Sequence, residues 1–106
     1  MRLLKSASTA SYGTDRGGNV SMIDIRRHNG GGHVIRYNHL VRLDYCLDTL
    51  LTIITSDCTI TLEGSGLDTL RERLQRQEVV YLQEGAKGPG ETILERVSLQ
   101  QHPHAT

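Results

Sequence analysis

Apolar and polar residues alternate along residues 40–46, near the middle of the chain. Val41, Leu43 and Tyr45 occupy every second position, and charged residues lie between them. A period of two is typical of an antiparallel strand with one buried face. We therefore expect Tyr45 to point into the core together with its two apolar neighbours.

Two further stretches follow at the spacing of a β-meander. Residues 50–55 are mostly apolar and rich in β-branched side chains, as in a central strand, and residues 58–63 alternate again. Short polar breaks separate the three stretches. The pattern predicts a three-stranded antiparallel meander over residues 40–63.

The hydrophobic period changes immediately after this meander. Leu67, Leu70 and Leu74 recur at helical spacing, and Ser65 precedes them as a candidate N-cap. The pattern predicts one short helix at about 66–77. Because a helix of about three turns is marginal on its own, we expect its leucine stripe to pack against the sheet.

Further strand-like segments flank the meander and the helix. Residues 20–28 and 33–37 lie on either side of an Asn-Gly turn signal, which predicts a hairpin. Residues 79–83 and 92–99 have the pattern of later strands. The predicted fold class is α+β, mostly antiparallel sheet packed against one short helix, followed by one or two further strands.

The two ends of the chain lack hydrophobic periodicity. Residues 1–19 contain scattered Ser, Thr and Gly, which is typical of a flexible arm, and residues 100–106 are expected to form a disordered tail. Residues 20–99 then form a single small α+β domain, in keeping with a chain of 106 residues.

The apolar residues are almost all aliphatic. The chain contains 14 Leu, 7 Ile and 6 Val but no Phe and no Trp, so four Tyr supply its only large rings. A small core of this kind leaves apolar sheet surface that a second copy can cover. We therefore expect the protein to form a homo-oligomer.

Charge is balanced overall but uneven along the chain. Lys plus Arg and Asp plus Glu both number 12, which argues against a nucleic-acid binder that works by bulk positive charge. Residues 1–43 hold seven basic and two acidic side chains, a net charge of +5, and residues 44–106 hold five basic and ten acidic ones, a net charge of −5. Two opposed patches would suit self-association or a basic groove, whereas charges spread over a solvated surface give the same totals.

Arginines and tyrosines of the N-terminal strands form a candidate contact site for nucleic acid or a protein partner. Small β-domains hold single strands by stacking bases on tyrosines beside arginines. In contrast to Tyr45, Tyr37 is expected to be exposed. The candidate residues are Arg26, Arg27, Arg36, Tyr37 and Arg42.

Recognisable motifs for metal, cofactor or catalytic chemistry are missing from the sequence. His28, His33 and His39 have no carboxylate at ligand spacing, so we expect no metal site. Cys46 and Cys58 match no metal-binding spacing and are expected to be buried, reduced thiols, although a disulfide between neighbouring strands stays open. The glycine-rich segments lack the order of a phosphate-binding loop, so no cofactor is expected.

Three functions therefore stay open. The leading hypothesis is a non-enzymatic interaction module that associates with itself. The second is a module that binds single-stranded RNA on a basic sheet face, and the third is a small enzyme, for which a pocket holding His39 and Asp57 would be the signature. No apolar run approaches the ~20 residues of a membrane span, and no signal peptide is evident, so we expect a cytoplasmic protein.

Overall fold

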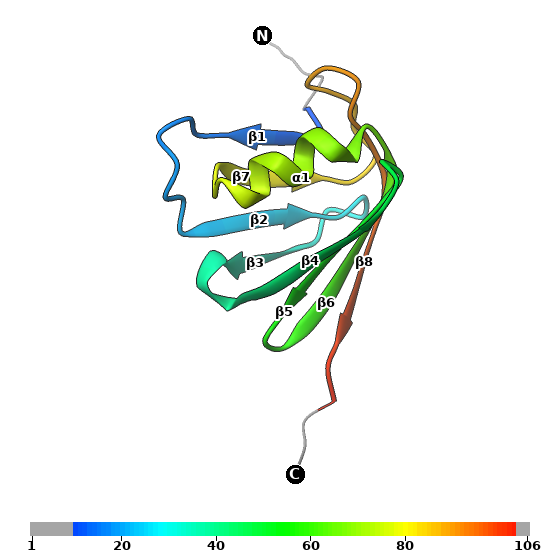
Figure 1. Ribbon diagram of the computed structural model, residues 1–106. Helices are drawn as coiled ribbons and strands as arrows, with labels where there is room; N and C mark the ends of the chain where they lie inside the picture. Colours follow the sequence, from blue (N-terminus) through cyan, green and yellow to red (C-terminus); the bar gives the residue numbers. More distant parts are fainter. Residues whose placement is uncertain (1–9, 104–106) are drawn as a thin grey trace, which may run out of the picture.

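Two four-stranded sheets and one short helix build the domain in the computed structural model, which describes residues 10–103 (Figure 1). The first sheet contains, in spatial order, β1 (Tyr12–Thr14), β7 (Val79–Gln83), β2 (Met22–Arg26) and β3 (Gly32–Arg36). The second sheet contains, in spatial order, β4 (Leu40–Cys46), β5 (Leu50–Thr55), β6 (Cys58–Ser65) and β8 (Ile93–Gln101). The helix is α1 (Leu67–Gln75), and a 3₁₀ helix, Tyr37–His39, joins the two sheets between β3 and β4.

The predicted fold class is confirmed. β4, β5 and β6 form the antiparallel meander, and β2 and β3 form the hairpin in which Ile23 lies opposite Ile35. The division into two sheets was not predicted. After α1 the chain does not add β7 to the meander; β7 inserts between β1 and β2 in the first sheet, antiparallel to β1 and parallel to β2.

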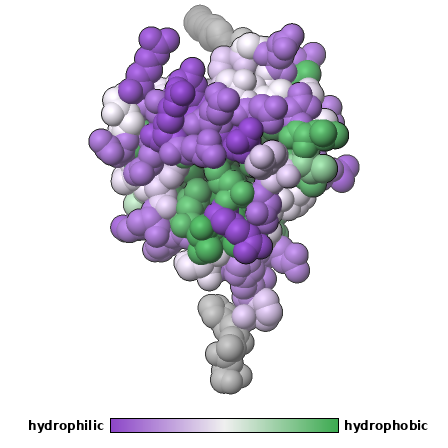
Figure 2. All heavy atoms as spheres, viewed as in Figure 1, coloured by the Kyte–Doolittle hydropathy of each residue, from purple (hydrophilic) through white to green (hydrophobic). Residues whose placement is uncertain are grey.

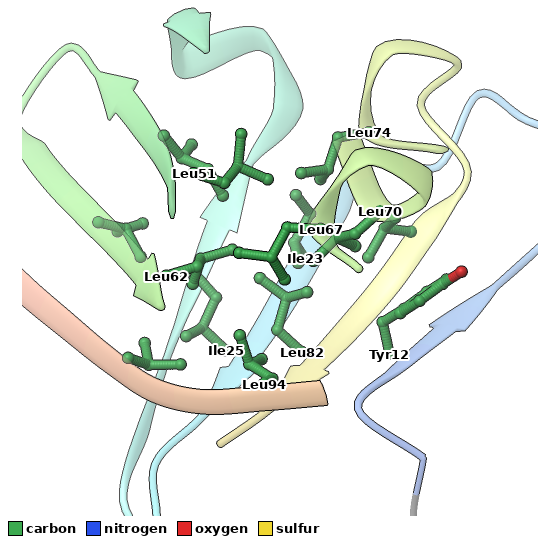
Figure 3. Packing of buried hydrophobic residues seen from close by; sticks show 14 of the residues in the cluster. Tyr12, Ile23, Ile25, Leu51, Leu62, Leu67, Leu70, Leu74, Leu82 and Leu94 are labelled. Carbon is green, nitrogen blue, oxygen red and sulfur yellow. The ribbon is translucent and has the colours of Figure 1, made fainter. Parts of the chain in front are cut away.

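The leucine stripe of α1 is buried, as its spacing predicts. Leu67, Leu70 and Leu74 are at most 3 % exposed. The helix lies over β7, contacts β5 as well, and directs these side chains between the two sheets (Figures 1 and 3). Three side chains of this size each contribute about 1.5–3 kcal/mol on full burial, so packing holds this short helix in place.

The predicted N-cap is wrong by one residue. Ser65 is the last residue of β6, and Gly66 occupies the cap position with a φ of 66°. That left-handed conformation favours glycine because it has no Cβ. The first helical N–H, that of Leu67, donates instead to the Asp48 carbonyl at 2.9 Å. A contact with the loop before β5 therefore replaces a side-chain cap.

The core lies between the sheets and consists mainly of aliphatic side chains from both of them (Figure 3). Its largest fully buried members are Ile23, Ile25, Leu51, Ile53, Ile60, Leu62, Leu67, Leu70, Leu82, Leu94, Val79 and Val97. Tyr12 and Tyr37 supply the buried rings. Nearly every strand contributes, which explains why the sheets are held together without Phe or Trp.

Order extends further toward both ends than the sequence predicts. The flexible arm expected over 1–19 is wrong where β1 forms, since β1 pairs with β7 and Tyr12 is only 3 % exposed. The tail expected over 100–106 is wrong at its start, because β8 continues to Gln101 beside β6. The remainder of both predictions, residues 1–9 and 104–106, lies outside the described residues.

Candidate interaction surfaces

The strand β4 is an edge of the second sheet. It pairs with β5 on one side, and no strand in residues 10–103 pairs with its other side. A bulge lies between Leu40 and Arg42, so the regular ladder to β5 runs from Arg42 to Cys46. Backbone N–H and C=O groups on such a free edge are available to another strand.

Tyr45 is exposed, contrary to the sequence-based expectation. It lies opposite the buried Leu51 and therefore on the core side of the sheet, as its alternation predicts. Its side chain is nevertheless 59 % exposed, because the sheet ends at β4 and little covers this position. The guanidinium carbon of Arg71, from α1, lies 4.1 Å from the ring centroid and covers part of the ring.

Apolar side chains gather on the surface around β4. Val41 is 64 % exposed, and the turn after β4 adds Leu47 at 77 % and Leu50 at 37 %. Figure 2 shows apolar surface over β3 and β4 and again at the turn that follows β4. Val34 is similarly exposed, at 60 %, but it lies on β3 opposite Asp24 and lines a separate groove along the β2–β3 hairpin. Grouped apolar exposure of this kind marks interaction sites more often than scattered apolar residues do.

One ion pair lies along the centre of β4. Arg42 Nε is 3.1 Å from Asp44 Oδ2, and both side chains are more than half exposed. Leu43 lies between them in sequence, on the opposite face, where it packs against the core. Along β4, the core-side residue Leu43 therefore lies between one positive and one negative charge on the outer face.

The two cysteines differ in exposure. Cys58 is buried, as expected, and its sulfur lies 3.2 Å from the hydroxyl of Thr55. Cys46 is exposed at the end of β4, so its expected burial is wrong. Both thiols are free.

The opposite edge of the same sheet, β8, is covered in its first part, from Leu94 to Val97. Leu94 donates its N–H to the Ala86 carbonyl at 3.0 Å and accepts from the Gly85 N–H at 2.7 Å. Further along, the N–H of Val97 donates to Oε2 of Glu84 at 2.8 Å. The segment that follows β7 therefore satisfies backbone groups on the outer side of β8.

Glu84 joins the two sheets. Its Oε1 accepts the backbone N–H of His28, just after β2, at 2.7 Å, while Oε2 accepts from Val97 in β8. Burial acts to raise the pKa of this carboxyl. The two hydrogen bonds and the nearby charges of Arg27 and His28 outweigh burial, so the pKa of Glu84 is lowered from its ordinary value of 4.5.

A shallow groove of about 570 Å³ lies along the β2–β3 hairpin. Its basic side chains are already engaged within the chain. Arg26 Nε is 3.1 Å from Asp24 Oδ2, and its guanidinium carbon lies 4.3 Å from the ring centroid of Tyr81. Arg27 Nε lies 3.6 Å from Oε1 of Glu84. The histidines at the ends of the hairpin loop, His28 and His33, also line the groove.

The structure separates the candidate contact residues. Arg26 and Arg27 share the groove, whereas Arg36 lines a second hollow of about 230 Å³ and Arg42 lies on β4. Neither hollow is lined by His39 or Asp57. In residues 10–103, no group of three or more His, Cys, Asp or Glu side chains is placed to hold a metal ion.

Tyr37 is buried, so its expected exposure is wrong. Only 8 % of the residue is exposed, and its hydroxyl donates to the Val79 carbonyl and accepts from the Val79 N–H, both at 2.9 Å. Burial raises the pKa of the Tyr37 hydroxyl to about 12; the hydrogen bond with Val79 opposes this effect and the Glu78 carboxylate adds to it. These hydrogen bonds connect the 3₁₀ helix between the two sheets to β7. The buried ring of Tyr37 is not available for base stacking.

Comparison with known proteins adds no functional information: no family, no curated protein and no solved structure matches this chain. Within residues 10–103, no helix is both long enough and apolar enough to cross a membrane.

Proposed function

We propose that this protein is a non-enzymatic interaction module that associates with itself through the free edge of β4. The observation that carries the proposal is the coincidence of an unpaired strand edge with exposed apolar side chains at Val41, Tyr45 and Leu47. Strand addition supplies backbone hydrogen bonds, and burial of the apolar side chains supplies the hydrophobic contribution.

A second feature of β4 supports this proposal. Exposed edge strands are commonly protected by charges, bulges or covering segments that prevent pairing with other chains. The bulge on β4 is confined to the start of the strand, and its single pair of charges is neutral overall. The remainder, Arg42 to Cys46, keeps a regular ladder to β5 and offers a regular edge to a partner.

Sedimentation velocity over a wide concentration range tests the proposal. Wild-type protein is expected to shift from monomer toward dimer as concentration rises, and Val41→Lys is expected to weaken that shift by placing a charge in the interface. Val34→Lys is the matched control, because Val34 is similarly exposed but lies on β3. A strictly monomeric wild-type protein, or equal losses in both variants, would contradict the proposal.

The groove along the β2–β3 hairpin favours a second function, binding of single-stranded RNA. Arg26, Arg27, His28 and His33 line it, and positively charged grooves follow nucleic-acid backbones. Binding is expected to be weak, because carboxylates already lie beside both arginines. Fluorescence anisotropy with labelled single-stranded RNA should show salt-sensitive affinity that Arg26→Ala lowers and Arg96→Ala, on β8, does not. Affinity that is absent or insensitive to salt excludes this function.

A further inference from the structure

The residue order along β4 is complementary to itself when the strand runs in the reverse direction. Leu43 is the centre of this order. Its neighbours in sequence are Arg42 and Asp44, and the next residues outward are Val41 and Tyr45. An antiparallel copy therefore presents opposite charges and apolar pairs at matching positions. Such self-complementarity is what an interface with twofold symmetry requires.

We propose that two copies of the chain join their β4 strands in antiparallel fashion about a twofold axis through Leu43, so that the two second sheets form one continuous sheet. This partner geometry rests on the proposed self-association. In this arrangement Leu43 faces the partner copy's Leu43. Arg42 faces the partner copy's Asp44, and Val41 faces the partner copy's Tyr45.

The geometry of strand pairing leaves few alternative registers. Directly opposed residues in an antiparallel pair point to the same side of the sheet, so a slip of one residue would bring core-side and outer-side positions together. Twofold pairing therefore places one residue opposite its own copy. A centre at Arg42 opposes two arginines, and a centre at Asp44 opposes two aspartates, both of which are unfavourable. Of these three adjacent centres, only Leu43 places opposite charges together.

The outer faces of the two strands would then carry four alternating charges. Each copy already holds the pair between Arg42 and Asp44 at 3.1 Å, and the twofold pairing adds two pairs across the interface. Ion pairs this exposed contribute little affinity. Their role is to select the register, because either adjacent centre, Arg42 or Asp44, creates a like-charge contact.

The exposed apolar side chains on either side of the charged pair supply the surface that the dimer buries. Val41 and Tyr45 are 64 % and 59 % exposed in the single chain, and Arg71 occupies only part of the Tyr45 ring surface. Val41 belongs to the bulge, where it is released from the regular ladder with β5 and is free to contact a ring of the partner copy. Aromatic pairs with β-branched residues are favourable across strands.

Charge exchange tests this register. Arg42→Asp leaves two acidic residues on β4 and Asp44→Arg leaves two arginines, so each variant alone is expected to dimerise about tenfold more weakly than wild type. An equimolar mixture of the two variants should form a heterodimer, and the double variant R42D/D44R should recover the homodimer. Sedimentation velocity at low ionic strength measures all four samples.

A matched control separates the interface from a general effect of charge. Arg26 and Asp24 form the same kind of pair on β2, also with a 3.1 Å distance from Nε to Oδ2. β2 lies between β7 and β3 and has no free edge. Arg26→Asp should therefore leave dimerisation unchanged. Circular dichroism confirms that each variant is folded.

A cysteine scan supplies an independent readout. In a Cys46→Ser background, Leu43→Cys should form an intermolecular disulfide under mild oxidation, because directly opposed residues have a Cα separation of about 4.5–5.5 Å. Tyr45→Cys should not, because its two copies would lie about 13 Å apart along the strands. For the same reason the native Cys46 thiols, separated by about 20 Å, should not link.

The outcomes distinguish the register from the proposed function. If wild type dimerises and Val41→Lys prevents it, but mixing the charge variants restores nothing and Tyr45→Cys links as well as Leu43→Cys, the register is wrong and self-association through β4 stands. If wild type stays monomeric throughout, both proposals fail. Recovery in the mixture together with selective linking at position 43 supports both.

Discussion

The two edges of the second sheet are protected from other strands to very different degrees. In the first part of β8, the backbone of the segment after β7 and the carboxylate of Glu84 bind outer backbone groups of Leu94 and Val97, and both residues are at most 1 % exposed. At β4, no other strand of the described chain pairs with the outer side, and Val41 is 64 % exposed. The first part of one edge is bound within the chain, and the other edge is left available.

The difference follows from connectivity. The chain passes from α1 through β7 directly into the segment that lies along β8, so a covering element reaches that edge without a long loop. The chain leaves β3 through the 3₁₀ helix Tyr37–His39 and enters β4 from one end, so this turn does not run along the strand. An edge that the fold leaves uncovered is where intermolecular pairing is least costly.

The two edges should differ most in how much stability is lost when an apolar side chain is shortened to alanine. Leu94→Ala on β8 should lower the free energy of unfolding by about 2–5 kcal/mol, because it opens a cavity in the core. Val41→Ala on β4 should change it by less than about 0.5 kcal/mol in dilute, monomeric protein. Urea denaturation compares the two variants. Equal losses would show that β4 is as well packed as β8.

A smaller loss of stability is expected when the carboxylate of Glu84, which binds the outer side of β8, is replaced. Glu84→Gln keeps the shape of the side chain but places an amide NH2 group against one of the two backbone N–H donors. Because hydrogen bonds to charged groups contribute about 1.5–3 kcal/mol each, the variant should lose stability in that range. Glu95→Gln, on the exposed side of β8, is the control and should be near neutral. A neutral Glu84→Gln variant would show that this contact does not close the edge.

The stability provided by Glu84 should also depend on pH. The pKa of Glu84 is lower in the folded protein than its ordinary value of 4.5, so the folded state favours the ionised form. Its contribution is present above pH 4.5 and is lost as pH falls through the folded pKa. The difference in unfolding free energy between wild type and Glu84→Gln should therefore shrink on acidification. A difference that is constant from pH 7 to pH 3 would contradict this role.

The smallest effect is expected at Tyr45, on the open edge. Arg71→Gln removes the cation that lies over the ring and should cost about 0.5–1 kcal/mol, the range for exposed cation–π contacts. Arg96→Gln, whose side chain is 70 % exposed, should cost less. Thermal denaturation at low protein concentration measures both. Indistinguishable melting temperatures would show that Arg71 does not stabilise this edge.

Local periodicity was sufficient to predict the elements whose partners are adjacent in sequence. The meander and the buried face of α1 follow from apolar spacing at Leu43, Leu62 and Leu70, because turns of a few residues bring neighbouring strands together. The same reasoning assigned Tyr45 to the core side of β4. It did not predict exposure, since exposure depends on whether another element extends beyond the sheet edge.

The local pattern of apolar and polar residues could not predict contacts between segments that are distant in sequence. Tyr37 is buried because its hydroxyl meets the backbone of Val79, 42 positions away in sequence. β1 is ordered because it pairs with β7, and Glu84 has its role because β7 inserts into the first sheet. A lone tyrosine or glutamate carries no local signal of such a partner. Of the candidate contact residues, Arg26 and Arg27 line one hollow, Arg36 and the buried Tyr37 line another, and Arg42 lines neither.

Amide hydrogen exchange at rising protein concentration tests the central claim most directly, because it reports on both edges in one experiment. Peptides covering residues 40–46 should exchange more slowly in concentrated than in dilute protein, as a second β4 protects the outer amides. Peptides covering residues 93–97 should exchange at the same rate in both, because the outer amides of Leu94 and Val97 are already bound within the chain. Exchange in residues 40–46 that does not respond to concentration would contradict self-association through β4.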